Sequence, residues 1–151
     1  MTDVTAVTGP VVGDELPELR LSVTPTFVVS TALATRDFQD VHHDRDAAVA
    51  RGSKDIFLNI LTTTGLVQRC VTDWAGSRGR VLGVKVRLGV PCYAGDTLTL
   101  SGRVTQTEPE VVVDVVGRCG LGDHVTGRVR LNWADIRTDV SRETSAPEAG
   151  R

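Results

Sequence analysis

Hydrophobic and polar residues alternate with a period of two over most of the second half of the chain. Apolar residues occupy alternate positions in four runs, at 82–90, 98–104, 111–115 and 125–133. This period is typical of strands with one face toward a core, and short turns between the runs predict an antiparallel sheet. A shorter alternating run, Leu19–Val23, ends before Pro25 and predicts one further strand.

A period of three to four residues replaces this alternation between Ser53 and Gly76. The positions that recur at this spacing are Ile56, Phe57, Ile60, Leu61, Thr64, Val67, Cys70, Val71 and Trp74. The stripe predicts one long core-facing helix that opens at Ser53 and ends at Gly76. Two short helices are expected before it, over residues 30–34 and over residues 45–51 ahead of Gly52.

An antiparallel sheet wrapped around one long helix is the hot-dog architecture, an α+β fold. A chain of 151 residues has room for one such domain with a real core, which we place at residues 18–136. Residues 1–17 and 137–151 mix small, polar and acidic residues without a period. We expect them to form a loose N-terminal arm and a flexible C-terminal tail.

Composition excludes several classes of function. The net charge is -2, and Lys and Arg are scattered among acids, so neither a nucleic-acid surface nor a polybasic membrane patch is expected. No run approaches the roughly 18 apolar residues of a membrane span, and residues 1–18 do not resemble a secretory signal. Cys70, Cys92 and Cys119 are sparse and odd in number, which predicts reduced thiols in a cytoplasmic protein.

The groups able to do acid–base chemistry gather between Ala34 and Asp46. Asp37 and His42 lie on either side of an expected turn, so their side chains can converge on one water or one substrate proton. A carboxylate beside an imidazole is the minimum for general acid–base catalysis near neutral pH. Asp37 and His42 are therefore the candidate catalytic pair.

Other interpretations of this segment stay open. Asp37 could end the preceding helix, and Asp44 or Asp46 could cap the following one. His42, His43, Asp44 and Asp46 are all metal-ligand types, but adjacent side chains cannot easily face one ion. Because no second His/Cys cluster completes a coordination shell, no metal is expected.

The run at residues 36–44 resembles the Asp-x-Asn-Pro-x-His-x-Asp motif of the MaoC-like (R)-specific enoyl-CoA hydratases. Asp37 and His42 fall on that family's catalytic Asp and His. Residues 25–133 are moreover similar to the small catalytic subunits of actinobacterial steroid side-chain enoyl-CoA hydratases, which act in cholesterol catabolism. The segments that carry this similarity are 29–46, 65–69, 71–76 and 88–91.

The resemblance implies the hot-dog fold and the addition of water across the α,β double bond of a steroid enoyl-CoA thioester. It implies no cofactor, because CoA is part of the substrate. Donors are also needed for the thioester oxygen, and we expect the backbone N–H groups near Asn59 and Ile60 to supply them. Most relatives have His-Gly at these two positions, and Gln39-Asp40 replaces Asn-Pro; the steroid-type relatives share both departures. The sequence leaves open which of Asp37 and His42 is the base.

The resemblance further implies a heteromer with a second MaoC-like subunit that lacks the catalytic pair and helps to form the CoA and steroid sites. That partner often carries an added region that binds a thiolase-like aldolase. Two other functions stay open. A hot-dog acyl-CoA thioesterase would use a carboxylate such as Asp55, and a non-catalytic assembly subunit would keep the fold without using the pair.

Overall fold

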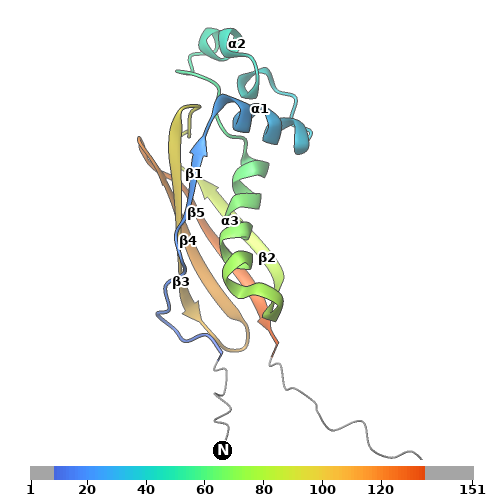
Figure 1. Cartoon of the computed structure of the whole chain (residues 1–151), viewed down its shortest axis with the longest axis vertical. Helices are drawn as coiled ribbons and strands as arrows, with labels where there is room; N and C mark the ends of the chain where they lie inside the picture. The colour runs from blue at the N-terminus through green and yellow to red at the C-terminus, as the bar shows by residue number, and fades with distance from the viewer. Residues whose placement is uncertain (1–8, 135–151) are drawn as a thin grey trace, which may run out of the picture.

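The computed structural model describes residues 9–134 and shows a five-stranded antiparallel sheet packed against one long helix (Figure 1). The strands are β1 (Leu19–Val23), β2 (Gly79–Leu88), β3 (Asp96–Gln106), β4 (Val111–Cys119) and β5 (Gly122–Trp133). The helix is α3 (Ile60–Ala75), followed by a short 3₁₀ turn, η2 (Gly76–Arg78). The predicted α+β hot-dog fold is confirmed. No helix in the described range is long and apolar enough to span a membrane.

The strand order differs from the order along the chain. The sheet runs β1-β3-β4-β5-β2, so β2 pairs with β5 and lies at an edge, away from the β3 that follows it. The pairing of β2 shifts register between Val81 and Gly83, which reverses the phase of the alternation there. Val81 packs on the core and Leu82 is 41% exposed, so the apolar face predicted to begin at Leu82 is wrong at its first position.

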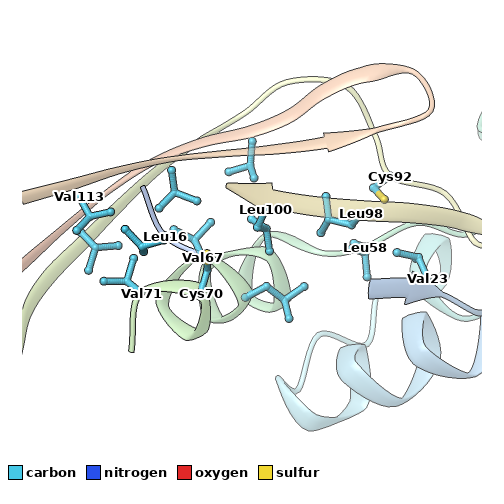
Figure 2. Packing of buried hydrophobic residues seen from close by; sticks show 14 of the residues in the cluster. Leu16, Val23, Leu58, Val67, Cys70, Val71, Cys92, Leu98, Leu100 and Val113 are labelled. Atoms are coloured by element: carbon cyan, nitrogen blue, oxygen red, sulfur yellow. The ribbon is translucent and has the colours of Figure 1, made fainter. Parts of the chain in front are cut away.

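The core lies between α3 and the facing side of the sheet. Figure 2 shows Val67, Cys70 and Val71 of the helix beside Leu100 and other strand residues, all of them buried. Glycine permits this close approach at one point in β5. A Cβ on Gly127 would lie 2.8 Å from Val67 Cγ1, so a larger residue would push the helix off the sheet.

The long helix begins later than the sequence predicts. It starts at Ile60 rather than Ser53, because the side chain of Asn59 caps it by accepting the Thr62 N–H at 2.8 Å. Ile56 and Phe57 lie in an extended segment before the helix, and Ile56 is buried. Their spacing from Ile60 is the same as the apolar spacing within α3. The helical spacing therefore continues through a segment that is not helical.

That extended segment pairs with the connection between β2 and β3. Phe57 forms a β-bridge with Tyr93, the Leu58 N–H donates to the Cys92 carbonyl at 3.0 Å, and the Ala94 N–H donates to the Ile56 carbonyl at 2.9 Å. These bonds hold the segment before α3 against the connection between β2 and β3.

Two short helices lie at the end of the sheet where α3 begins (Figure 1). Helix α1 (Pro25–Ala34) starts earlier than expected, because Thr24 caps it and Pro25 suits a first turn. A 3₁₀ turn, η1 (Asp40–His42), leads to α2 (Arg45–Ala50), which is capped by Asp44. The capping alternative is thus confirmed for Asp44.

The described part of the N-terminal arm is attached to the sheet. The Gly13 and Leu16 N–H groups donate to the carbonyls of Val104 and Gly102, each at 2.9 Å, and the Leu16 side chain is buried. Residues 13–16 therefore lie along β3, within the segment for which the lack of a period had predicted a loose arm. The predicted tail at residues 137–151 lies outside the described residues.

Candidate active site

Asp37 is positioned by the way α1 ends. The Arg36 N–H donates to Leu33 O at 3.0 Å and the Asp37 N–H to Ala32 O at 2.9 Å, which is the Schellman pattern of helix termination. Arg36 has a φ of 57°, in the left-handed region that glycine usually occupies at this position. This backbone turn directs Asp37 away from the helix, so the alternative that Asp37 helps to end the helix is compatible with a role in chemistry.

His42 is held by the extended segment before α3. Its Nδ1 lies 2.8 Å from the Phe57 carbonyl oxygen, and its ring packs edge-on against the Phe57 ring. A carbonyl oxygen can only accept, so Nδ1 carries the hydrogen and Nε2 is left to face the site. The side chain is buried, and its orientation is thereby set.

The two predicted catalytic side chains meet. His42 Nε2 lies 3.5 Å from Asp37 Oδ2, with the carboxylate partly open to solvent and the imidazole buried. In the tautomer set by Phe57, the carboxylate and Nε2 are both acceptors, so one water can donate a hydrogen to each of them. A water held in this way has its oxygen lone pairs directed outward, toward a bound electrophile.

The side chain of Asn59 joins this pair to α3. Its Nδ2 donates to Asp37 Oδ2 at 3.1 Å and to Thr35 Oγ1 at 2.8 Å, while its Oδ1 caps the helix at Thr62. One buried amide therefore fixes the carboxylate relative to the helix N-terminus. The sequence singled out Asn59 for its backbone N–H, and its side-chain role was missed because only the fold brings residues 35–37 beside it.

The first turn of α3 lies next to the pair. Thr62 donates to Asn59 Oδ1 and Thr63 to Asn59 O, so both of these N–H groups are engaged. The N–H groups of Ile60 and Leu61 come before them, where an α-helix has no internal acceptor to offer. A helix N-terminus carries a partial positive charge, which suits a developing oxyanion.

Two other carboxylates of this region, those of Asp55 and Asp40, form ion pairs. Arg45 Nε donates to Asp55 Oδ1 at 2.8 Å, which lowers the pKa of the Asp55 carboxyl below its usual value. Arg51 pairs with Asp40 at 2.7 Å and lowers the pKa of that carboxyl in the same way. Asp55 thus lies in a structural pair rather than free to activate water for thioester hydrolysis.

Metal-donor side chains come together elsewhere in the described chain. The cluster comprises Cys92, Asp96 and Cys119, none of which belongs to the segment at residues 42–46 that offered ligand types. Within that segment, Asp44 is occupied by capping, since it accepts the Ala47 N–H at 3.0 Å.

A buried histidine of β5, His124, contacts the first turn of α3, and the sequence did not single it out. His124 Nδ1 donates to the Val90 carbonyl at 2.7 Å, and Nε2 lies 2.8 Å from Thr63 Oγ1, whose hydroxyl donates to it. Burial lowers the pKa of His124 below its ordinary value of 6.5, which keeps the ring neutral. An isolated histidine in a strand gives no sequence signal for this contact.

A family model and a named bacterial protein both match most of this chain. The family model described as MaoC like domain matches residues 9–117. The 3-oxo-4,17-pregnadiene-20-carboxyl-CoA hydratase beta subunit of Mycobacterium tuberculosis (strain ATCC 25618 / H37Rv) is 65% identical over 126 residues, covering 83% of this chain and 98% of the relative.

Two solved structures share the fold of this chain. A chain of the ChsH1-ChsH2 complex from Mycobacterium tuberculosis superposes with a TM-score of 0.80 at 65% identity, covering 82% of this chain and 98% of that one. The (R)-hydratase from A. caviae involved in PHA biosynthesis gives a TM-score of 0.76 at 19% identity, covering 85% of this chain and 100% of that one. The second likeness is one of fold alone.

Proposed function

The chain belongs to the MaoC-like domain family, and we propose that it is the catalytic subunit of a steroid side-chain enoyl-CoA hydratase. The reaction adds water across the α,β double bond of the CoA thioester. The observation that carries the proposal is the meeting of Asp37 and His42 at 3.5 Å, beside the N-terminus of α3. The name and 65% identity of the mycobacterial hydratase beta subunit support the substrate class.

In the proposed reaction, Asp37 and His42 Nε2 hold the water and take one of its protons. The water oxygen forms a bond to the β carbon, the C=C π electrons move toward the thioester, and an enolate results. The pair then delivers a proton to the α carbon, so the elements of one water are added and no other reactant is needed. CoA is carried by the substrate, and the proposed reaction requires no cofactor.

The enolate oxygen needs donors that are already in place when its charge develops. We assign this role to the N–H groups at the start of α3, on Asn59 and Ile60, with Leu61 next in line. Ile60 does not offer the open backbone of a glycine, but its side chain is about half exposed and so is not wedged into the core. The Asn59 cap holds this turn in register with Asp37.

The proposed active form is a heteromer with a second MaoC-like subunit that lacks the catalytic pair. In this proposal the second subunit also binds a thiolase-like aldolase. The inward residues of the edge strand β2, Val81, Val84 and Val86, are only partly buried in the single chain. An unpaired edge with incompletely covered apolar residues is what a second hot-dog subunit would cover. The ChsH1-ChsH2 assembly of the related structure supports this choice.

Apolar side chains around the pair support a large apolar substrate or a partner surface. The exposed ones, in α1, in the connection that follows it, in α2 and at the start of α3, are Leu33, Phe38, Val49, Ile60 and Leu61. A cavity of about 430 Å³ lies instead over β2, β4 and β5 and is lined by residues such as Lys85 and Arg128, with neither Asp37 nor His42 among them. We therefore expect the partner to complete the substrate site. The three free cysteines support a cytoplasmic location.

Asp37→Asn and His42→Ala test the proposal. Each should lower the rate of hydration by at least about a hundredfold, the usual scale for a positioned acid or base. The assay follows the loss of enoyl-thioester absorbance with a steroid enoyl-CoA, using the chain together with its partner subunit. Asp46→Asn, an exposed carboxylate on α2, is the matched control and should keep full activity. Unchanged turnover in both site variants would contradict the proposal and favour a non-catalytic assembly subunit.

A further inference from the structure

Two of the three cysteines lie side by side behind the candidate active site. Cys92, in the connection after β2, is fully buried, while Cys119, the last residue of β4, is partly exposed. The two Sγ atoms and a carboxylate oxygen of Asp96 all lie within 4.8 Å of one another. The Cys119 thiol also donates to the Pro91 carbonyl at 3.7 Å, which turns it toward the segment that carries Cys92.

Backbone bonds hold the two thiol-bearing segments together. The Gly89 N–H donates to His124 O at 2.8 Å and the Val90 N–H to Asp123 O at 3.0 Å, which ties the connection to the β4–β5 hairpin. At Gly89 a Cβ would lie 2.2 Å from Asp123 O, so the two backbones are in direct contact. The proximity of the thiols is therefore imposed by the fold.

The surroundings favour a bond between the sulfurs over a shared metal ion. Both oxygens of Asp96 accept backbone N–H groups, from Thr97 at 2.7 Å and from Gly120 at 2.9 Å. Two thiols and an engaged carboxylate fall short of the four ligands of a closed structural zinc site. A disulfide, in contrast, needs no third ligand, because it joins only the two sulfur atoms.

We propose that Cys92 and Cys119 form a reversible disulfide when the chain meets a peroxide. The sulfur of Cys119 attacks one oxygen of hydrogen peroxide, the O–O bond breaks, the released hydroxide leaves as water with the Cys119 proton, and Cys119 becomes a sulfenic acid. The sulfur of Cys92 then attacks the Cys119 sulfur, the S–S bond forms, and the hydroxyl leaves as water with the Cys92 proton. Two thiols are oxidised by two electrons in total, and hydrogen peroxide is reduced to two waters.

Exposure decides the order of these steps. Burial raises the pKa of the Cys92 thiol to about 12, so this thiol is the poorer group for the first attack. Cys119 can meet the oxidant because it is partly open to solvent. Cys70 lies buried in α3, and burial raises the pKa of its thiol as well. We expect Cys70 to stay reduced.

The disulfide would act on the site through a short chain of contacts. Cys92 O accepts the Leu58 N–H at 3.0 Å, and the neighbouring Tyr93 pairs with Phe57, whose carbonyl oxygen holds His42 Nδ1 at 2.8 Å. The two Sγ atoms lie within 4.8 Å of each other, and a disulfide joins them at about 2.05 Å, so oxidation changes the packing of Cys92 and of the segment that carries it. We expect His42 to be displaced and hydration to slow; this second part rests on the proposed function.

The experiment treats the full chain with hydrogen peroxide and measures intact mass and digested peptides without reduction. The expected result is a mass lower by two hydrogen atoms, a crosslinked peptide containing Cys92 and Cys119, and recovery of the starting mass with dithiothreitol. Cys119→Ser should abolish the crosslink, as should Cys92→Ala, whereas Cys70→Ala should retain it. Cys119 is partly exposed, so its variant tests the proposal even if the core substitution at Cys92 impairs folding.

Hydration is measured on the same oxidised and reduced samples with the partner subunit present. We expect the oxidised chain to lose several-fold in turnover and dithiothreitol to restore it, with no such loss in Cys119→Ser. Absence of the crosslink would overturn the disulfide. A crosslink with unchanged turnover would overturn only the coupling to His42, and a reduced chain that never hydrates would count against the proposed function instead.

Discussion

The side chain of Asn59 offers a test that separates helix stability from the positioning of Asp37. Asn59 accepts the Thr62 N–H through Oδ1 and donates through Nδ2 to Asp37 and Thr35. Asn59→Ala removes both functions. Asn59→Ser keeps a hydroxyl that can cap the helix but is too short to replace the Nδ2 donor to the carboxylate. The pair of variants therefore divides one side chain into its two roles.

The expected magnitudes follow from these contacts. Loss of an N-cap costs about 1 kcal/mol, and loss of a hydrogen bond to a charged group costs roughly 1.5–3 kcal/mol. Asn59→Ala should therefore lower the free energy of unfolding by about 1 kcal/mol more than Asn59→Ser does. Both variants release Asp37, so both should lower turnover, by roughly tenfold if about 1.4 kcal/mol of positioning is lost in the transition state.

Urea unfolding followed by circular dichroism measures the stability of each variant, and steady-state hydration with the partner subunit measures kcat. Equal destabilisation by the Ala and Ser variants would show that the cap is not the source of the difference. Turnover within twofold of the natural chain in both variants would refute the positioning of Asp37 by Asn59. Thr64→Ala, at a partly buried position in the second turn of α3, serves as the control for a substitution in this helix.

Two further predictions concern stability. Burial lowers the pKa of His124, so the unfolded chain takes up a proton on this ring more readily than the folded chain, and the free energy of unfolding falls as pH drops below about 6.5. His124→Gln cannot be protonated, so urea unfolding should show a smaller loss of stability between about pH 7 and pH 5. The same pH dependence in the variant and the natural chain would contradict this prediction. A Cβ at Gly127 would meet Val67, so Gly127→Ala should lower the free energy of unfolding by about 1–3 kcal/mol. Gly65 is exposed in α3 with open space around it, so Gly65→Ala should raise the free energy of unfolding by up to about 1 kcal/mol. The unfolding temperatures of the two variants should therefore shift in opposite directions.

Much of the fold could be predicted because each of its layers has its own period. The alternation in β3, β4 and β5 reports burial on one face, and the stripe at Val67, Cys70 and Val71 reports the helix that covers it. Strand pairing leaves no such trace. The placement of β2 beside β5 depends on contacts between distant residues, and the register shift near Leu82 breaks the alternation that the sequence suggested.

The start of α3 shows why boundaries were harder to predict. Ile56 is buried in an extended segment, and the spacing of its apolar neighbours continues into the helix without interruption. Only the cap at Asn59 marks the true start, and Asn is a common cap that also has other uses. The same holds at α1, which starts at Pro25 after its Thr24 cap rather than at Ser30.

The candidate pair could be identified because its members are close in sequence and chemically distinctive. Asp37 and His42 are separated by one turn, and the structure brings their side chains together at 3.5 Å. The groups that hold them come from farther along the chain: Phe57 sets the tautomer of His42, and Asn59 binds Asp37. Such supporting contacts become visible only when the fold is known.

The most direct test of catalysis by this chain is one assay of the purified chain and its second MaoC-like subunit with a steroid side-chain enoyl-CoA. We predict loss of enoyl-thioester absorbance with formation of the hydroxyacyl-CoA, and no such change when the chain carries Asp37→Asn. Release of free CoA thiol in place of hydration, persisting in Asp37→Asn, would contradict the hydratase and favour thioester hydrolysis.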